Sequence, residues 1–403
     1  MSKVVLYCLS LRGTGHFMRM SLLARRLAAQ HEVYLVDGGR PVVSQIPVPG
    51  INLVELPRIW RTEADQVEPY QTSASMADVV AARRSRLEAL CREIRPDLIV
   101  VDHFPFTKWV ISDDILPMIR LARHLNPRAA AVCSVRTPLA VNVSTAGVQT
   151  PEQKIIQTLN HHFQALLIHS DPRFSPLEEK YPWVAKIQIP RHYTGMICQE
   201  VPEASSVEDR TQAAPAVGHS NILVSAGGDG GVLLRRSCIE AWKLLSRDTG
   251  PPAGRMTLVL PPEPGEWEIQ ELEQSAASLP IHIERFSPQF TGWLQQAQLS
   301  ISQAGYNTCS NLLQTRVRAI LLPHPTATDQ AERAFEFARH GLATAVGLAE
   351  LDGPRMAAAI RHALSLPAPQ HDLDLNGIER SCELISQLLC EHGMDSKRTS
   401  SLL

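Results

Sequence analysis

The chain has 403 residues, which leaves room for two domains of about 150–200 residues each, and its mixture of hydrophobic (44%) and charged (20%) residues is that of an ordinary globular protein. A formal net charge of −2 gives no electrostatic reason to expect nucleic acid or an anionic membrane as a partner. No apolar run reaches the ~20 residues of a membrane-spanning helix, so we expect a cytoplasmic protein without a transmembrane segment.

Through the first half of the sequence, short apolar strands alternate with amphipathic helices. Val4–Leu9 is predicted to be a buried strand, and His16–Gln30 a helix with its apolar residues on one face. Val42–Gln71 is rich in proline and polar residues and is predicted to be a long loop with one short strand at Ile51–Glu55. This alternation is typical of a doubly wound parallel sheet. Further strands are expected at Val33–Val36, Asp97–Val101, Ala129–Cys133 and Ala165–His169, and further helices at Met76–Glu93, Asp113–His124 and Glu152–Phe163.

The second half begins the same alternation again, after a segment rich in Ala, Ser, Pro and Glu. We predict an N-terminal Rossmann-like domain over 1–198, a linker over 199–219 and a second Rossmann-like domain over 220–370. A last helix over 371–393 could pack back on the first domain, and the polar tail 394–403 is expected to be disordered. In this half, strands are expected at Asn221–Ser225, Met256–Leu260, Ile281–Glu284, Leu299–Ser302, Arg318–Leu322 and Thr344–Val346, and helices at Val232–Leu245, Trp267–Ala277, Tyr306–Leu313, Asp329–Arg339 and Pro354–Leu364.

The eight cysteines are scattered, and no two of them form a CxxC pair. Most of them lie in apolar runs, which indicates buried free thiols in a reducing compartment. We therefore expect no metal ion bound by these cysteines.

Three glycine-rich turns follow apolar strands and precede helices. Strand, glycine turn and helix is the arrangement by which α/β proteins expose backbone N–H groups at the positive end of a helix, where a phosphate can bind. One such turn is weak evidence, because a plain strand-to-helix connection has the same sequence pattern. Turns of this kind in both halves suggest a cleft that brings two substrates together. Their sequences are LRGTGH at 11–16, SAGGDGG at 225–231 and SQAGYNT at 302–308.

The last of these turns gives the strongest signal. Gly305 and the helix that follows would direct backbone N–H groups and the Thr308 hydroxyl at an anion. The next strand ends in LPHP at 322–325, and Asp329-Gln330 opens the helix after it. A carboxylate beside a carboxamide at the C-terminal edge of a parallel sheet suits several sugar hydroxyls at once. The alternative is that Asp329 only caps its helix.

With these motifs in this order, the chain resembles GT-B-fold glycosyltransferases and is similar to the MurG-like family 28 group and to a related set of predicted bacterial glycosyltransferases. The resemblance covers residues 1 to about 365. Its marks are GTGH at 13–16, VVDHFPF at 100–106, YTG at 193–195, AGYNT at 304–308, and LPHP with the Asp-Gln pair behind it. The fold it implies is two doubly wound Rossmann-like domains that face a central cleft.

The resemblance also implies an activity in biosynthesis. A sugar would be transferred with inversion and without a metal ion, from a nucleotide-sugar donor on the C-terminal domain to an acceptor on the N-terminal domain. UDP is the expected nucleotide, with dTDP and other carriers left open, and the resemblance implies no bound cofactor. The helix start near Gly305 would hold the diphosphate, the backbone at Arg285-Phe286 would contact the base, and Asp329 and Gln330 would hold the sugar.

One position departs from the family pattern. Family 28 has a glutamate shortly after the glycine turn that holds the ribose hydroxyls, and Asn311 stands at that place here. A neutral amide lacks the charge that makes such hydrogen bonds roughly twice as strong. The donor-binding residues that the resemblance implies are Gly227, Gly228, Asp229, Arg285, Phe286, Gly305, Tyr306, Asn307, Thr308, Asn311, His324, Asp329 and Gln330.

The acceptor hydroxyl needs a base within reach, and His16, directly after a glycine at a strand end, is well placed for that role. An imidazole near its ordinary pKa of roughly 6.5 suits the task. In many inverting GT-B enzymes a histidine at this turn is the base, and in plant-type ones an aspartate that ends a later strand orients it; Asp102 occupies the matching place. The alternatives are that His16 packs at its helix start and that Asp102 caps a loop. The residues expected to contact a small-molecule or lipid-linked acceptor are Gly15, Arg19, His103, Phe104 and Arg136.

Two other functions stay open at this point. A GT-B sugar-nucleotide epimerase would form product from a nucleotide sugar alone. A catalytically silent GT-B protein would bind a partner or ligand, and Asn311 is the residue that favours it, whereas His16, Asp102, Asp329 and Gln330 favour an enzyme.

Overall fold

The structure is a computed structural model that describes residues 1–41, 49–62, 66–139, 141, 143, 149–201, 220–226, 231–249, 254–261, 264–287, 289–324, 327–347 and 351–399, with the backbone alone at 220, 248–249 and 392–399. The chain divides into two compact units. One unit is Met1–Ile197 together with Leu373–Leu403, and the other is Cys198–Asp372. Most of the predicted linker, residues 202–219, lies outside the described residues.

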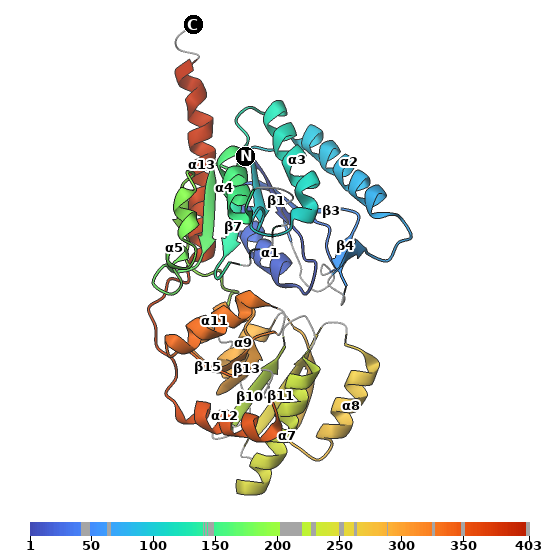
Figure 1. Ribbon diagram of the computed structural model, residues 1–403, viewed down its shortest axis with the longest axis vertical. Helices are drawn as coiled ribbons and strands as arrows, with labels where there is room; N and C mark the ends of the chain where they lie inside the picture. Colours follow the sequence, from blue (N-terminus) through green and yellow to red (C-terminus); the bar gives the residue numbers. More distant parts are fainter. Residues whose placement is uncertain are drawn as a thin grey trace. The chain divides into compact units, whose positions relative to one another are not determined.

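Seven strands of the described N-terminal unit form one parallel sheet in the order β3-β2-β1-β6-β7-β8-β9 (Figure 1). The strands β6 and β8 are buried along their whole length, which explains their continuous apolar sequences LIVV and ALLI. The strands are β1 (Lys3–Cys8), β2 (Glu32–Asp37), β3 (Asn52–Glu55), β6 (Leu98–Asp102), β7 (Ala130–Arg136), β8 (Ala165–His169) and β9 (Arg191–Tyr193), and a separate antiparallel pair is formed by β4 (Ile59–Arg61) and β5 (Val67–Pro69).

Two helices of this unit begin at capping boxes in the sequence. The α2 helix starts at a capping box in which Ser75 accepts a hydrogen bond from the Asp78 backbone and the Asp78 carboxylate accepts one from the Ser75 backbone. The helix α4 has the equivalent box between Thr150 and Gln153. Figure 1 shows α2 and α3 side by side. The helices are α1 (Gly15–Leu27), α2 (Met76–Ile94), α3 (Ser112–Leu125), α4 (Pro151–His162), α5 (Leu177–Lys180) and α13 (Gly377–Thr399), with 3-10 turns η2 (Trp109–Ile111) and η3 (Pro182–Lys186).

The C-terminal helix α13 belongs to the N-terminal unit. It packs against α1 and β7, and Ile385 is fully buried there. At its start, the Met196 backbone donates to the Asp374 carbonyl at 2.8 Å. Gly195 is required at this approach, since a Cβ there would lie 2.7 Å from the Asp374 carboxyl carbon. The helix is drawn as far as Thr399, into the polar segment from residue 394 for which the sequence predicts a disordered tail.

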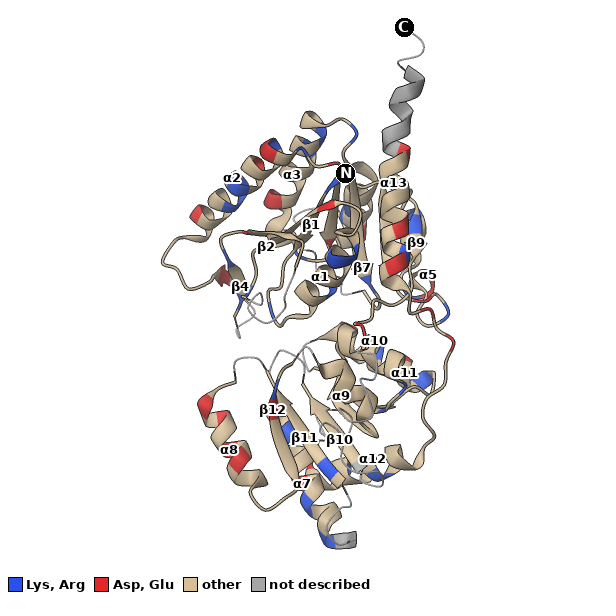
Figure 2. Cartoon of the chain, turned by 180° about the vertical axis from the view of Figure 1, so that it is seen from behind, with Lys and Arg blue, Asp and Glu red and all other residues tan. Residues whose placement is uncertain are grey.

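The described part of the C-terminal unit forms a second parallel sheet, in the order β12-β11-β10-β13-β14-β15. Arg235 on α7 binds Glu268 on α8, and Arg236 binds Glu271. The acidic residues of α8 are red in Figure 2. The strands are β10 (Ser220–Ser225), β11 (Gly254–Leu260), β12 (Ile281–Arg285), β13 (Leu299–Gln303), β14 (Arg318–Leu322) and β15 (Thr344–Ala345), and the helices are α7 (Val232–Thr249), α8 (Glu266–Ala276), α9 (Phe290–Gln296), α10 (Tyr306–Thr315), α11 (Thr328–Arg339) and α12 (Gly353–Ser365).

The first and last glycine turns follow strands at which the connections of each sheet start to run toward opposite edges. In the first sheet β1 leads to β2 on one side, whereas its other neighbour β6 leads to β7 on the opposite side. In the second sheet β10 and β13 stand in the same relation. A ligand site in an open α/β sheet forms at such a switch point, beyond the carboxyl ends of the strands. The two sheets therefore place the segments after β1, β6 and β13 where ligands are expected, whereas residues 227–230 after β10 lie outside the described residues.

The predicted strands and helices of both halves are confirmed, with ends that shift by a few residues. The region Val42–Gln71 differs, because it holds β4 and β5 as well as the predicted β3. Strands of three residues are too short to give a readable hydrophobic alternation. Among the described residues, no helix is long and apolar enough to span a membrane.

Replacing Ile385 with Ala tests the docking of α13. We expect Ile385→Ala to lower the free energy of unfolding by about 2–5 kcal/mol, because the change opens a cavity in a closely packed interface. The matched control is Gln387→Ala on the exposed side of the same helix, which should change little. Urea unfolding measures both; equal effects of the two changes would show that α13 is not packed as described.

Candidate active site and nucleotide-sugar site

The site in the N-terminal unit begins with Asp102, the last residue of β6. Because β6 pairs with β1 in register, with Val101 opposite Tyr7, the carboxyl ends of both strands meet at one edge of the sheet. The chain leaves β1 through the first glycine turn and returns in α1, which carries His16 in its first turn. The switch point thus brings together two side chains that lie 86 residues apart in the sequence.

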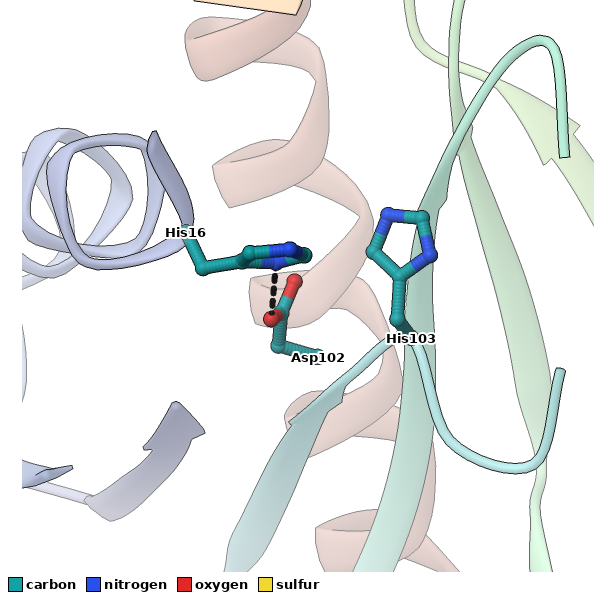
Figure 3. Close-up of side chains that lie close together, drawn as sticks. All are labelled: His16, Asp102 and His103. Atoms are coloured by element: carbon teal, nitrogen blue, oxygen red, sulfur yellow. Dashed lines mark hydrogen bonds and ion pairs between the residues drawn. The ribbon is translucent and has the colours of Figure 1, made fainter. Parts of the chain in front are cut away.

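His16 and Asp102 are in direct contact (Figure 3). The distance from His16 Nδ1 to Asp102 Oδ2 is 2.7 Å. An ionised carboxylate only accepts hydrogen bonds, so Nδ1 carries the proton and Nε2 keeps its lone pair. The Asp102 side chain is inaccessible to solvent, whereas 20% of the His16 side chain is exposed. This pair has the geometry in which a carboxylate fixes the tautomer of a histidine base.

Two cations also bind the Asp102 carboxylate. Arg19 Nη2 donates to Oδ1, and Lys108 Nζ donates to Oδ2, the same oxygen that accepts from His16. Both cationic side chains are almost fully buried, with 1% and 7% of their surface exposed. Burial alone would raise the pKa of Asp102, but Lys108, His16 and Arg19 together hold it well below its usual range. Asp102 is therefore ionised across the physiological pH range.

The same surroundings keep His16 neutral. Burial and, after it, the charge of Lys108 outweigh the attraction of Asp102 and lower the pKa of His16 to about 3. This pKa differs from the expected value near 6.5, because burial disfavours the charged imidazolium and the nearby Lys108 ammonium adds to that effect. His103 lies on the other side, with its ring edge-on to His16 at 5.2 Å between centroids, and burial lowers its pKa as well (Figure 3).

Lys108 is the functional candidate that sequence reasoning missed. It lies in the loop after β6, outside every motif, and its position depends on a turn that sequence periodicity does not predict.

Donor atoms of His16, Asp102 and His103 lie within 4.8 Å of one another, close enough for a metal ion. However, the Lys108 ammonium already supplies positive charge to the carboxylate of that group, so we assign no metal ion to it.

The residues predicted to contact an acceptor separate into two groups. Gly15 is exposed at the start of α1, and Arg136 is half-buried at the end of β7, close enough for its charge to act on the pKa of His16. Arg19, His103 and Phe104 are different, because Arg19 is bound to Asp102, and His103 and Phe104 are buried. Their side chains have structural roles and do not line a surface.

In the C-terminal unit, Gly305 precedes α10 with an ordinary φ of −66°. Among the described residues, a Cβ added to Gly305 would meet only Thr308 Oγ1, at 4.0 Å, so the described part of the chain leaves space at this turn. Asn307 and Thr308 are half-buried in the first turn of α10, and Tyr306 is buried beneath it. The first N–H groups of a helix have no partner within the helix, which makes this open turn a suitable anion site.

The segment after β14 lies at the neighbouring strand end and is held by two polar contacts. The Gln330 carboxamide oxygen accepts from the His324 backbone at 2.9 Å. The Asp329 carboxylate binds Arg333 one helical turn later at 3.0 Å. The N-cap of α11 is Ala327, and Asp329 lies in the first turn of the helix. Arg333 is a second residue that sequence reasoning missed; it is buried and also donates to the Ala304 carbonyl at 2.6 Å, which ties α11 to the glycine turn.

Asn311 is engaged within the protein. It is buried, its Nδ2 donates to Gln199 Oε1, and its Oδ1 accepts from the Gln199 backbone at 3.2 Å. In this arrangement its carboxamide joins α10 to the start of the C-terminal unit.

Of the other residues predicted to bind the donor, Arg285 ends β12 and is exposed, and the Phe286 backbone N–H donates to the Leu260 carbonyl. Gly227, Gly228 and Asp229 lie outside the described residues.

Removal of the Asp102 carboxylate tests the charge arrangement. We expect Asp102→Ala to lower the free energy of unfolding by about 3–5 kcal/mol, because it leaves two buried cations without their shared anion. Asp113→Ala, an exposed carboxylate in the first turn of α3, should cost only about 0.3–1 kcal/mol. Chemical unfolding measures both, and comparable losses would contradict the described cluster.

Comparisons with known proteins agree on the fold. Residues 261–376 match the Glycosyltransferase family 28 C-terminal domain. A stretch of 158 residues is 29% identical to the UDP-N-acetylglucosamine–N-acetylmuramyl-(pentapeptide) pyrophosphoryl-undecaprenol N-acetylglucosamine transferase of Rhizobium meliloti (strain 1021), and it covers 38% of this chain and 41% of that protein. The chain thus spans about two fifths of the curated relative that it matches.

Two solved structures match over nearly the whole chain. MurG of Acinetobacter baumannii is 14% identical with a TM-score of 0.57, and the match covers 96% of this chain and 100% of that one. A UDP-N-acetylglucosamine 2-epimerase is 12% identical with a TM-score of 0.58, over 98% and 96% of the two chains. The chain therefore has the GT-B fold, and residues 261–376 are similar to the C-terminal domain of family 28 glycosyltransferases.

Proposed function

We propose that the chain is an inverting, metal-independent glycosyltransferase that transfers a sugar from a nucleotide diphosphate sugar to a small-molecule or lipid-linked acceptor. UDP is the nucleotide that we assign to the donor. The observation that carries the proposal is the contact of His16 with Asp102, which leaves the Nε2 lone pair of a neutral histidine available at a switch point. The match to a family 28 domain supports the donor class.

In the proposed reaction, the acceptor hydroxyl transfers its proton to His16 Nε2 as its oxygen forms a bond to the anomeric carbon. The bond from that carbon to the diphosphate oxygen breaks at the same time, and the diphosphate leaves with the bonding electron pair. Attack from the face opposite the leaving group inverts the anomeric centre. Asp102 does not take up the proton; it fixes the ring through Nδ1 and holds the tautomer.

The C-terminal unit would stabilise the leaving group. The open turn at Gly305 permits a phosphate to approach the N-terminus of α10, where N–H groups and the helix dipole favour negative charge. Thr308 adds a hydroxyl to the same turn. Fixed donors of this kind supply electrostatic stabilisation as charge develops on the leaving oxygen, the role that a divalent cation has in other transferases. Asp329 and Gln330 are assigned to the hydroxyls of the donor sugar.

The epimerase and binding-protein alternatives are tested by the same assays. The likeness to a UDP-N-acetylglucosamine 2-epimerase concerns the fold alone at 12% identity. An epimerase forms product from the nucleotide sugar without an acceptor. A binding protein takes up the nucleotide without turnover. Transfer that requires both donor and acceptor separates our proposal from both.

His16→Ala tests the base. We expect the rate of transfer to fall on the order of 10²–10⁴-fold, the usual contribution of a general base, while donor affinity stays unchanged. The control is His124→Ala, which removes an exposed histidine from α3. Steady-state transfer assays and calorimetry with the nucleotide measure the two quantities. A near wild-type rate in His16→Ala would rule out His16 as the base.

Gly305→Ala tests the donor site. Because the added methyl group has open space and the backbone φ is ordinary, the protein should fold normally. A phosphate bound closely at the turn would collide with it, so UDP affinity should fall roughly tenfold or more, about 1.4 kcal/mol. Gly347→Ala, an equally open glycine, is the matched control. Unchanged UDP affinity, or no saturable heat with UDP in any form of the chain, would contradict the assignment.

A further inference from the structure

We propose that Lys108 is a positioning residue for His16: its ammonium group neutralises Asp102 and thereby keeps the imidazole unprotonated, with Nε2 free to accept a proton. The inference rests on the proposed function, since it concerns the residue that we assign as base. It adds a third member to the pair, and this member acts through charge and does not need to touch the substrate.

The contacts of Lys108 support this role directly. Its Nζ donates to Asp102 Oδ2 and lies 3.2 Å from His16 Nδ1. His16 and Lys108 therefore share one carboxylate oxygen, while Arg19 occupies the other. Protonation of His16 would place an imidazolium directly against the ammonium and would give one carboxylate three cationic neighbours. Such a site disfavours the protonated ring.

The turn after β6 brings the ammonium to this place. Lys108 has a left-handed backbone with a φ of 64°, and the Thr107 backbone donates to the His103 carbonyl at 3.0 Å, so the loop folds back toward the strand end. The next turn is closed by a hydrogen bond from Ile111 to the Lys108 carbonyl at 3.0 Å. The Lys108 side chain is 7% exposed. Its position is thus set by backbone contacts and burial, unlike that of an ordinary surface lysine.

The other charged or titratable groups around His16 do not replace Lys108. Asp102 on β6 favours protonation, and Arg136 on β7 disfavours it with a smaller effect than Lys108. His103, on the loop after β6, is held neutral by burial. Arg19 on α1 binds the far oxygen of the carboxylate. Lys108 is therefore the positive charge in closest contact with His16 among the described residues.

The role has a functional consequence. A histidine paired only with a carboxylate gains proton affinity and is blocked as a base when the solution becomes mildly acidic. With Lys108 on the same carboxylate, His16 stays unprotonated there. The structure thus predicts that His16 can still accept a proton from the acceptor at pH values below the ordinary pKa of histidine, although the ring is a weaker base.

The test is an NMR titration of the His16 ring in the full chain, with its signal assigned by loss in His16→Gln. In the wild type, the ring should stay neutral down to the lowest pH at which the chain is folded. In Lys108→Met, the titration should move upward by about one pH unit or more, roughly tenfold in proton affinity, and enter the accessible range. Lys108→Arg keeps a cation and should behave like the wild type.

The control is Lys186→Met, which removes an exposed lysine far from the cluster in sequence. A His16 ring that stays neutral in Lys108→Met over the same range as in this control overturns the inference. Circular dichroism in each variant fixes the pH range over which the chain is folded. If Lys108→Met unfolds, Lys108→Gln provides the same loss of charge with a polar side chain.

Transfer assays add a second readout. In Lys108→Met, the acidic limb of the kcat/KM profile should move to higher pH, by the same amount as the NMR titration, whereas a merely structural loss would lower the rate at every pH. The two proposals fail separately. A shift of the His16 titration in a chain without transferase activity overturns the proposed function alone, and transfer activity without that shift overturns the role of Lys108 alone.

Discussion

The buried carboxylate of Asp102 is the group on which the N-terminal site depends. It receives His16 and Lys108 on one oxygen and Arg19 on the other, at the end of a strand that is buried along its whole length. A lone carboxylate in this place would be protonated or expelled, because burial disfavours its charge. The cations hold it ionised, and the ionised form in turn fixes the tautomer of the histidine. The contacts of Asp102 therefore determine its own charge, the tautomer of His16 and the position of α1, which carries His16 and Arg19.

The parallel sheets explain why such groups come together from distant parts of the chain. In each unit the connections leave the central pair of strands in opposite directions, so the loops after them diverge and leave room at the sheet edge. In the N-terminal unit this edge carries a buried charge cluster. In the C-terminal unit the described part of the edge carries an open helix start at Gly305 and a segment held by Gln330 and Arg333. The two edges suit different chemistry, proton transfer in one and anion binding in the other.

Much of the fold was predictable, because apolar strands and amphipathic helices have clear periods and glycine turns mark their junctions. The meeting of His16 with Asp102 followed from the same logic, since both stand at strand ends. The electrostatics did not follow. The position of Lys108 depends on a left-handed turn, and the pairing of Asn311 with Gln199 depends on how a loop packs against a helix. Such contacts between loop side chains leave no periodic signal in the sequence. Burial, together with the charge of Lys108, lowers the pKa of His16 below the expected value.

The most direct test of the account is the protonation pattern of the His16 ring in the resting protein. A long-range ¹H–¹⁵N correlation spectrum at neutral pH distinguishes the two neutral tautomers and the imidazolium. The account predicts a neutral ring with its proton on Nδ1, bound to Asp102, and an unprotonated Nε2. A proton on Nε2, or a doubly protonated ring, would contradict the account at its centre, because no lone pair would then be available to receive the acceptor proton.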